Sequence, residues 1–66
     1  MTLQIKKLED GIIEITDFSE GGGPLIRCFE DGRIELYEVP QYGGEERFEG
    51  FYPTINAALK VAEGWT

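Results

Sequence analysis

Hydrophobic and polar residues alternate along two segments of the chain, 5–15 and 26–36, and these segments are near copies of each other. They read IKKLEDGIIEI and IRCFEDGRIEL, so one pattern, I-[K/R]-x-[L/F]-E-D-G-x-I-E-[I/L], occurs twice at a separation of 21 positions. Alternation with a period of two is typical of half-buried strands, and the central Asp-Gly marks a turn. The repeat therefore predicts one β-hairpin used twice, at 3–18 and at 25–39.

The two faces of these hairpins favour a three-residue Glu-Asp-Gly loop in both copies. In the second hairpin, this loop sets Ile26 opposite Leu36 and Arg27 opposite Glu35. One face is then apolar, and the other carries a cross-strand ion pair. A two-residue Asp-Gly loop would mix the faces, because a one-residue slip exchanges them. The predicted core face consists of Ile5, Ile13, Ile15, Ile26, Cys28, Ile34 and Leu36.

The C-terminal part of the chain predicts one more strand and one helix. The strand is expected at 46–51. The helix is expected at 55–63, with Thr54 as its N-cap and apolar residues recurring at helical spacing. Gly64 suits a left-handed helix end. Because so short a helix is not stable alone, it must pack on the sheet.

These elements form a single domain of 66 residues. We expect an α+β fold, a four- or five-stranded antiparallel β-meander with one C-terminal α-helix packed on one sheet face. The segment 19–24, Ser-Glu-Gly-Gly-Gly-Pro, joins the hairpins and predicts a flexible connector. The single cysteine, Cys28, allows no intramolecular disulfide. A second copy of the chain is therefore a candidate source of stability, because small domains often need such help.

The joint between the last strand and the helix has a recognisable sequence. Gly-Phe-Tyr-Pro-Thr at 50–54, followed by Ala57, Ala58 and Ala62, resembles the strand-to-helix corner of the arm-binding domains of phage integrases and of a family of plant DNA-binding domains. The resemblance implies only the topology of strands laid on one helix. Those families bind DNA through basic residues of the sheet, whereas the sheet predicted here is rich in glutamate.

The residue types available argue against catalysis. The chain has no histidine, which is the commonest catalytic base and metal ligand. Neither Asp-Gly turn has the ligand spacing of a calcium loop. Glu35 with Glu14 or Glu49 offers a carboxylate pair, but glycoside-type chemistry needs a cleft that a chain of this size hardly builds. We therefore expect no enzymatic activity, no cofactor and no bound metal.

The charge balance limits the partners. Thirteen acidic residues against six basic ones give a net charge of −7, which disfavours direct binding to nucleic acid or to anionic membranes. The acidity serves either solubility or the recognition of a basic partner. Charged residues within 1–15 leave no apolar segment, so we expect no secretory signal. No stretch of the sequence approaches about 18 consecutive apolar residues. With a lone thiol, a cytoplasmic location is expected.

Aromatic residues gather in the C-terminal half, interleaved with proline and glycine. Strand alternation places Phe48 and Phe51 on opposite faces, and Phe29 opposite Arg33 is placed for a cation–π contact. The aromatic residues either close the end of a small core or form a binding surface, where Tyr and Trp are enriched.

Two functions are compatible with this sequence. The first is a small, non-catalytic, acidic protein-interaction module that binds a protein, a second copy of itself included, through an aromatic-lined sheet face or a strand edge. The alternative is an acidic mimic of nucleic acid that inhibits a basic nuclease or DNA-binding protein. The candidate partner-binding residues are Tyr37, Tyr42, Phe51, Glu35 and Glu49.

Overall fold

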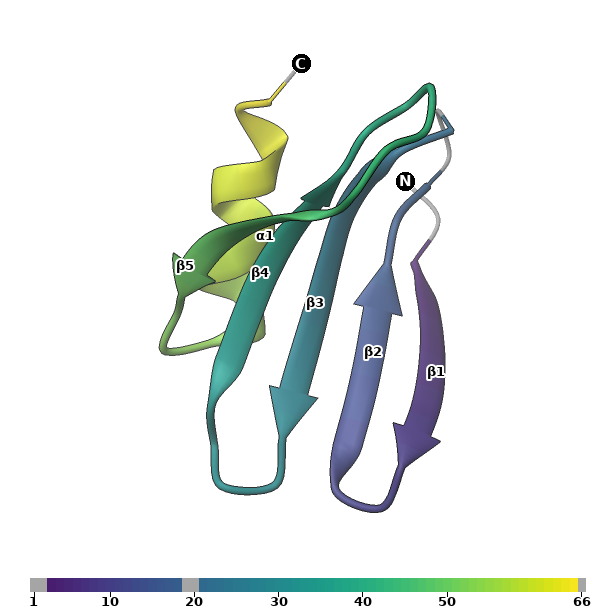
Figure 1. The fold of residues 1–66 in the computed structure, drawn as a ribbon. Coiled ribbons are helices and arrows are strands. Elements are labelled where there is room, and N and C mark those ends of the chain that lie inside the picture. Colours follow the sequence, from purple (N-terminus) through teal and green to yellow (C-terminus); the bar gives the residue numbers. More distant parts are fainter. Residues whose placement is uncertain (1–2, 19–20, 66) are drawn as a thin grey trace.

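The computed structural model describes residues 3–18 and 21–65 and contains one five-stranded antiparallel sheet with one helix behind it (Figure 1). The strands follow one another across the sheet in chain order, and the helix comes last. The elements are β1 (Gln4–Glu9), β2 (Ile12–Thr16), β3 (Gly23–Phe29), β4 (Ile34–Val39), β5 (Arg47–Phe51) and α1 (Ile55–Glu63). The predicted α+β meander is confirmed.

The second hairpin has the predicted register. Ile26 lies opposite Leu36, and Arg27 lies opposite Glu35. The hairpin closes around a three-residue loop, since the Phe29 N–H donates a hydrogen bond to the carbonyl oxygen of residue 33 at 2.9 Å. Gly32 in this loop has a φ of 93°, a backbone conformation that costs glycine no Cβ clash.

The first hairpin reaches the predicted register by a different turn. Ile5 lies opposite Ile15, as the alternation requires. However, Glu9 pairs directly with Ile12, so the loop has two residues and the extra residue is a bulge at Leu8. The extra residue compensates for the shorter loop, so from Lys7 opposite Ile13 onward the strands pair as predicted. Each side chain of this stretch therefore lies on the predicted face of the sheet.

The core lies between α1 and the two strands that the helix covers, β3 and β4. The helix begins after Thr54, whose Oγ1 accepts a hydrogen bond from the Ala57 N–H at 3.1 Å, which confirms the predicted N-cap. The buried core cluster consists of Ile15, Ile26, Leu36 and Ala58. Within the described part of the chain, no helix is long and apolar enough to cross a membrane.

Two of the predicted core residues are exposed. Ile5 and Ile13 retain 72% and 44% of their accessible surface, although the register places them on the same face as the core. The prediction was wrong for these residues because α1 packs against β3 and β4. Ile15 of β2 is buried at the edge of this core, but Ile13 and Ile5 lie beyond it and stay exposed.

The helix end also differs from the prediction. Gly64 has a φ of −83°, so the expected left-handed conformation is absent. Its N–H instead donates to the Val61 carbonyl oxygen at 3.1 Å, which tightens the last turn. Trp65 follows and packs against the core cluster.

The glycine-rich connector is packed where the structure describes it. A Cβ atom on Gly22 would lie 2.5 Å from the Val39 carbonyl oxygen and 2.8 Å from the Gln41 Cα. Strand β3 already begins at Gly23. The predicted connector, 19–24, is therefore shorter than expected, because residues 23 and 24 belong to β3. Residues 19 and 20 lie outside the described residues.

Candidate interaction face

The face of the sheet opposite α1, which we call the open face, carries the predicted candidate residues of the strands. The register aligns Glu14, Arg27, Glu35 and Phe51 in one row across β2 to β5. A second row contains Tyr37 and Phe48, which lie opposite each other on β4 and β5. In Figure 1 these strands lie in front of the helix, so α1 covers none of these side chains.

One end of the open face is covered by the chain itself. Thr16 and Leu25, which share the row of Tyr37, are only 8% and 6% exposed. Figure 1 shows the segment between β4 and β5 passing in front of the sheet at this end. The exposed part of the open face therefore lies toward β5 and toward the hairpin turns.

Three aromatic rings form a cluster on the open face. The Tyr37 and Phe48 ring centroids are 5.4 Å apart, and those of Phe48 and Phe51 are 5.1 Å apart with the rings at 69°. These are the tilted and edge-to-face arrangements that aromatic quadrupoles favour. Phe48 and Phe51 remain 51% and 62% exposed. This aromatic cluster is thus packed internally and still open to solvent.

A β-bulge in β5 explains why the two phenylalanines share a face. Phe51 lies opposite Glu35 and Phe48 opposite Tyr37, so β5 has one more residue than β4 in this stretch, Glu49. The prediction that Phe48 and Phe51 point to opposite faces was wrong, because the extra residue shifts the alternation by one. Gly50, with a φ of 136°, was the signal for this, since glycine inside a strand often marks a bulge.

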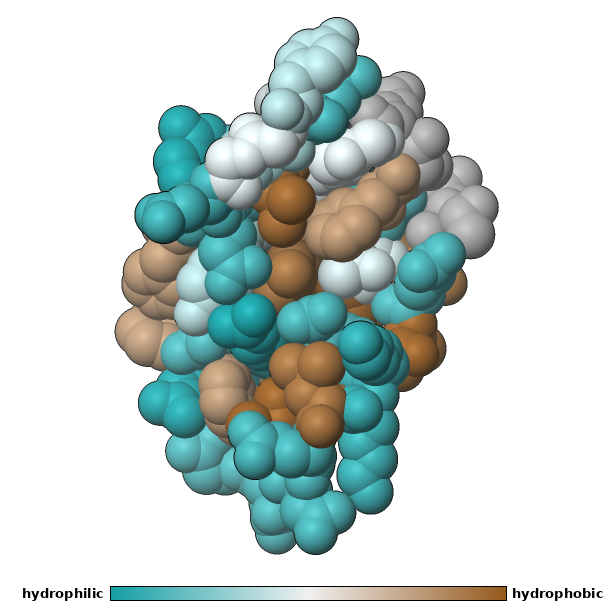
Figure 2. Space-filling view, turned by 45° about the vertical axis from the view of Figure 1, so that its right-hand side comes forward, coloured by the Kyte–Doolittle hydropathy of each residue, from teal (hydrophilic) through white to brown (hydrophobic). Residues whose placement is uncertain are grey.

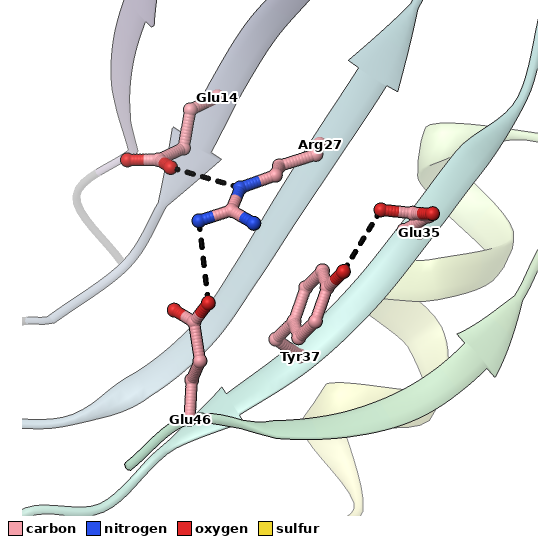
Figure 3. Close-up of polar contacts among 5 residues, drawn as sticks. All are labelled: Glu14, Arg27, Glu35, Tyr37 and Glu46. Carbon is pink, nitrogen blue, oxygen red and sulfur yellow. Dashed lines mark hydrogen bonds and ion pairs between the residues drawn. The ribbon is translucent and has the colours of Figure 1, made fainter. Parts of the chain in front are cut away.

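Arg27 lies at the centre of the open face, between two carboxylates (Figure 3). Its Nε lies 3.3 Å from Glu14 Oε2 and its Nη2 lies 3.3 Å from Glu46 Oε1. The guanidinium carbon lies over the Tyr37 ring, 5.0 Å from its centroid. Burial opposes the charge, but the Glu14 hydrogen bond and the charges of Glu46 and Glu14 outweigh it and raise the pKa of Arg27.

Glu35 does not pair with Arg27, although the two residues are opposite each other in the register. Its carboxylate accepts a hydrogen bond from the Tyr37 hydroxyl at 2.9 Å (Figure 3). Burial first, and this hydrogen bond second, raise the pKa of Tyr37. The prediction paired Arg27 with Glu35 across the strands. In the structure Arg27 pairs with Glu14 on β2 instead. Among the described residues, no basic side chain forms an ion pair with Glu35.

The other two predicted candidates lie outside the aromatic cluster. Tyr42 is in the loop between β4 and β5 and is 94% exposed. Glu49 is the extra residue of the β5 bulge and is also exposed. The structure thus brings Tyr37, Glu35 and Phe51 together and leaves these two apart from them. Phe48, which sequence reasoning did not select, completes the cluster.

The end of the sheet near the hairpin turns has two further features. Arg33 lies over the Phe29 ring at 4.2 Å, which confirms the predicted cation–π contact.

A shallow depression of about 370 Å³ is lined by Lys7, Gly11, Ile12, Ile13, Cys28, Phe29 and Glu30. Burial raises the pKa of the Cys28 thiol, which opposes formation of a nucleophilic thiolate. Figure 2 brings the side of the molecule with β1 and β2 forward. It shows the hydrophobic surface there as separate patches among hydrophilic residues.

Residues 3–18 and 21–65 contain no group of three or more His, Cys, Asp or Glu side chains placed to hold a metal ion. No protein-family model matches the chain, and no curated protein or solved structure matches it. The function is therefore inferred from the geometry of the open face.

Proposed function

We propose that this protein is a small, non-catalytic, acidic protein-interaction module that binds its partner through the open face. The observation that carries the proposal is the pair of exposed, mutually packed rings of Phe48 and Phe51 on a sheet face that α1 does not cover. Aromatic residues surrounded by polar groups are the usual anchors of protein interfaces. Here Glu35 lies opposite Phe51, and Arg27 and Glu14 continue the same row across the sheet.

The exposed ring surface sets a scale for the affinity. With roughly 200 Å² for each ring and about 25 cal/mol per Å², covering the exposed parts of Phe48 and Phe51 contributes about 5–6 kcal/mol. Association costs about 4–15 kcal/mol, so the two rings alone support only weak binding. The polar groups around the rings must therefore contribute to any stable complex.

The compartment and the oligomeric state belong to the same proposal. A chain whose only cysteine is Cys28 suits a reducing compartment, and we place the protein in the cytoplasm. The simplest partner is a second copy that covers the aromatic cluster with its own. Sedimentation velocity across a range of protein concentrations tests this case first.

A mimic of nucleic acid is the second candidate, favoured by the net charge of −7. Its support is weaker because Arg27 lies between Glu14 and Glu46, and Arg47 pairs with Glu38. These internal ion pairs interrupt the run of free negative charge that a phosphate mimic needs.

Affinity capture from the source lysate tests the proposal at about 50 mM and about 500 mM salt. The matched variants are Phe51→Ala on the open face and Ile5→Ala on the opposite face, where Ile5 is an apolar residue that is also more than half exposed. We expect a partner that the wild type and Ile5→Ala retain at both salt concentrations and that Phe51→Ala loses. Retention only at low salt, together with a basic nucleic-acid-binding protein as the captured species, supports the mimic instead. Equal capture by both variants, or a monomer that captures nothing, contradicts the proposal.

A further inference from the structure

The open face already holds one guanidinium group, that of Arg27, and the geometry defines what such a site requires. The group lies over the ring of Tyr37 and within 3.3 Å of carboxylate oxygens of Glu14 and Glu46. The ring supplies a negative π-face, and the carboxylates accept charged hydrogen bonds. An aromatic ring beside a carboxylate is thus the arrangement by which this sheet binds arginine.

A ring beside a carboxylate occurs again at the β5 end of the row. Phe51 lies directly opposite Glu35, and directly opposite residues in antiparallel strands have adjacent side chains. The Phe51 ring is 62% exposed, and within the described part of the chain no Lys or Arg forms an ion pair with Glu35. Because β5 is the last strand of the sheet, no neighbouring strand covers this side of Phe51.

Charges across this row alternate in sign up to Glu35. Lys6 lies opposite Glu14, Glu14 opposite Arg27, and Arg27 opposite Glu35. The next residue in the row, Phe51, is aromatic and not basic. The charged part of the row therefore ends on the Glu35 carboxylate, with the exposed Phe51 ring beside it. The protein as a whole has a net charge of −7. A positively charged group is the complement of this end of the row.

We propose that Glu35 and Phe51 form a binding site for an arginine side chain of the protein partner, an inference that rests on the proposed function. The guanidinium would stack on the exposed face of the Phe51 ring and donate to the Glu35 carboxylate. Arginine suits the site better than lysine, because its planar group can stack and donate at the same time. The Tyr37 hydroxyl, bonded to Glu35 at 2.9 Å, holds the carboxylate in place.

A peptide titration followed by ¹H–¹⁵N NMR tests this site. The probe is an acetylated and amidated (Gly-Arg)₄ peptide at about 50 mM salt, and the control peptide has citrulline in place of every arginine, which removes the charge and keeps the shape. We expect the arginine peptide to shift the amide signals around Glu35 and Phe51, and the citrulline peptide to leave them unchanged. Equal effects of the two peptides, or shifts confined to other parts of the chain, overturn the proposal.

Three variants separate the site from the general acidity of the protein. Glu35→Gln and Phe51→Leu should each weaken peptide binding about two- to fivefold, since each removes one of the two contacts. Phe51→Leu keeps an apolar side chain, and the dispersion of the amide signals verifies that each variant is folded. Glu63→Gln makes the same charge change at an exposed position on α1. If Glu63→Gln weakens binding as much as Glu35→Gln, the peptide senses only net charge and the site is refuted.

Capture of the natural partner distinguishes failure of this inference from failure of the proposed function. A partner that is lost by Phe51→Ala and fully retained by Glu35→Gln refutes the arginine site and leaves the interaction module intact. A partner retained by Phe51→Ala refutes the module itself. Loss with both variants, together with retention by Glu63→Gln, is the result that the arginine site predicts.

Discussion

Replacing Arg27 by glutamine should destabilise the protein measurably, because three contacts of its guanidinium disappear together. The Arg27 side chain is 29% exposed, while those of Glu14 and Glu46 are 16% and 37% exposed. A charged hydrogen bond in a partly buried site contributes about 1.5 kcal/mol, and a more exposed ion pair about 0.2–1 kcal/mol. The contact with the Tyr37 ring adds about 0.5–1 kcal/mol. After solvent screening is allowed for, the expected loss is about 2 kcal/mol.

Urea unfolding measures this loss, with Trp65 as the fluorescent reporter because its side chain packs against the core. At about 0.05–0.15 kcal/mol per residue, a 66-residue domain has roughly 3–10 kcal/mol of stability, so the shift in midpoint should be large. Arg33→Gln is the matched control. The Arg33 side chain lies over the Phe29 ring on an exposed turn, and the loss of this contact should cost no more than about 1 kcal/mol.

Salt separates the contributions at Arg27. About 1 M NaCl should reduce the difference between wild type and Arg27→Gln, because it screens the two ion pairs. If Arg27→Gln unfolds at the same urea concentration as the wild type, the guanidinium makes no net contribution. The reasoning about how this face holds arginine is then refuted.

Three further changes should have distinct effects. Leu36→Ala removes a fully buried side chain at a cost of about 2–5 kcal/mol, so thermal unfolding followed by far-UV circular dichroism should show a much lower melting temperature, and an unchanged melting temperature contradicts the core described here. Gly22→Ala places a Cβ 2.5 Å from the Val39 carbonyl oxygen and should lower the melting temperature, whereas an unchanged value would mean that the connector is loose. The folded pKa of Tyr37 is raised, so its contribution to stability is present below the unfolded value of about 10 and is lost as the pH rises through the folded value. Tyr37→Phe should therefore lose less unfolding free energy than the wild type between about pH 9 and about pH 11, and equal losses contradict the burial of Tyr37 together with its hydrogen bond to Glu35.

The parts of the fold that sequence reasoning predicted correctly depend on local signals. The repeated Glu-Asp-Gly turn with its alternating strands defines both hairpins, and Thr54 with a short apolar stripe defines α1. Which strands the helix covers depends on tertiary packing, for which no local signal exists. Ile5 and Ile13 therefore carried the pattern of core residues and are nevertheless exposed.

The candidate site was predicted only in part, for the same reason. Alternation puts Tyr37, two residues after Glu35, on the same face as Glu35, and the structure agrees, but alternation misplaced Phe48, because the bulge in β5 shifts it. The pairing of Arg27 with Glu46 depends on where a loop folds back over the sheet. Neither bulge position nor loop path follows from alternation alone.

Photo-crosslinking in the source cells tests the central claim most directly, that the open face is the binding surface. One variant carries p-benzoylphenylalanine in place of Phe51, and the matched variant carries it in place of Ile5 on the opposite face. The account predicts a discrete crosslinked product from position 51 and none from position 5. A product from position 5 with none from position 51 would contradict it and assign the interface to the exposed apolar surface at Ile5 and Ile13 on the helix side of the sheet.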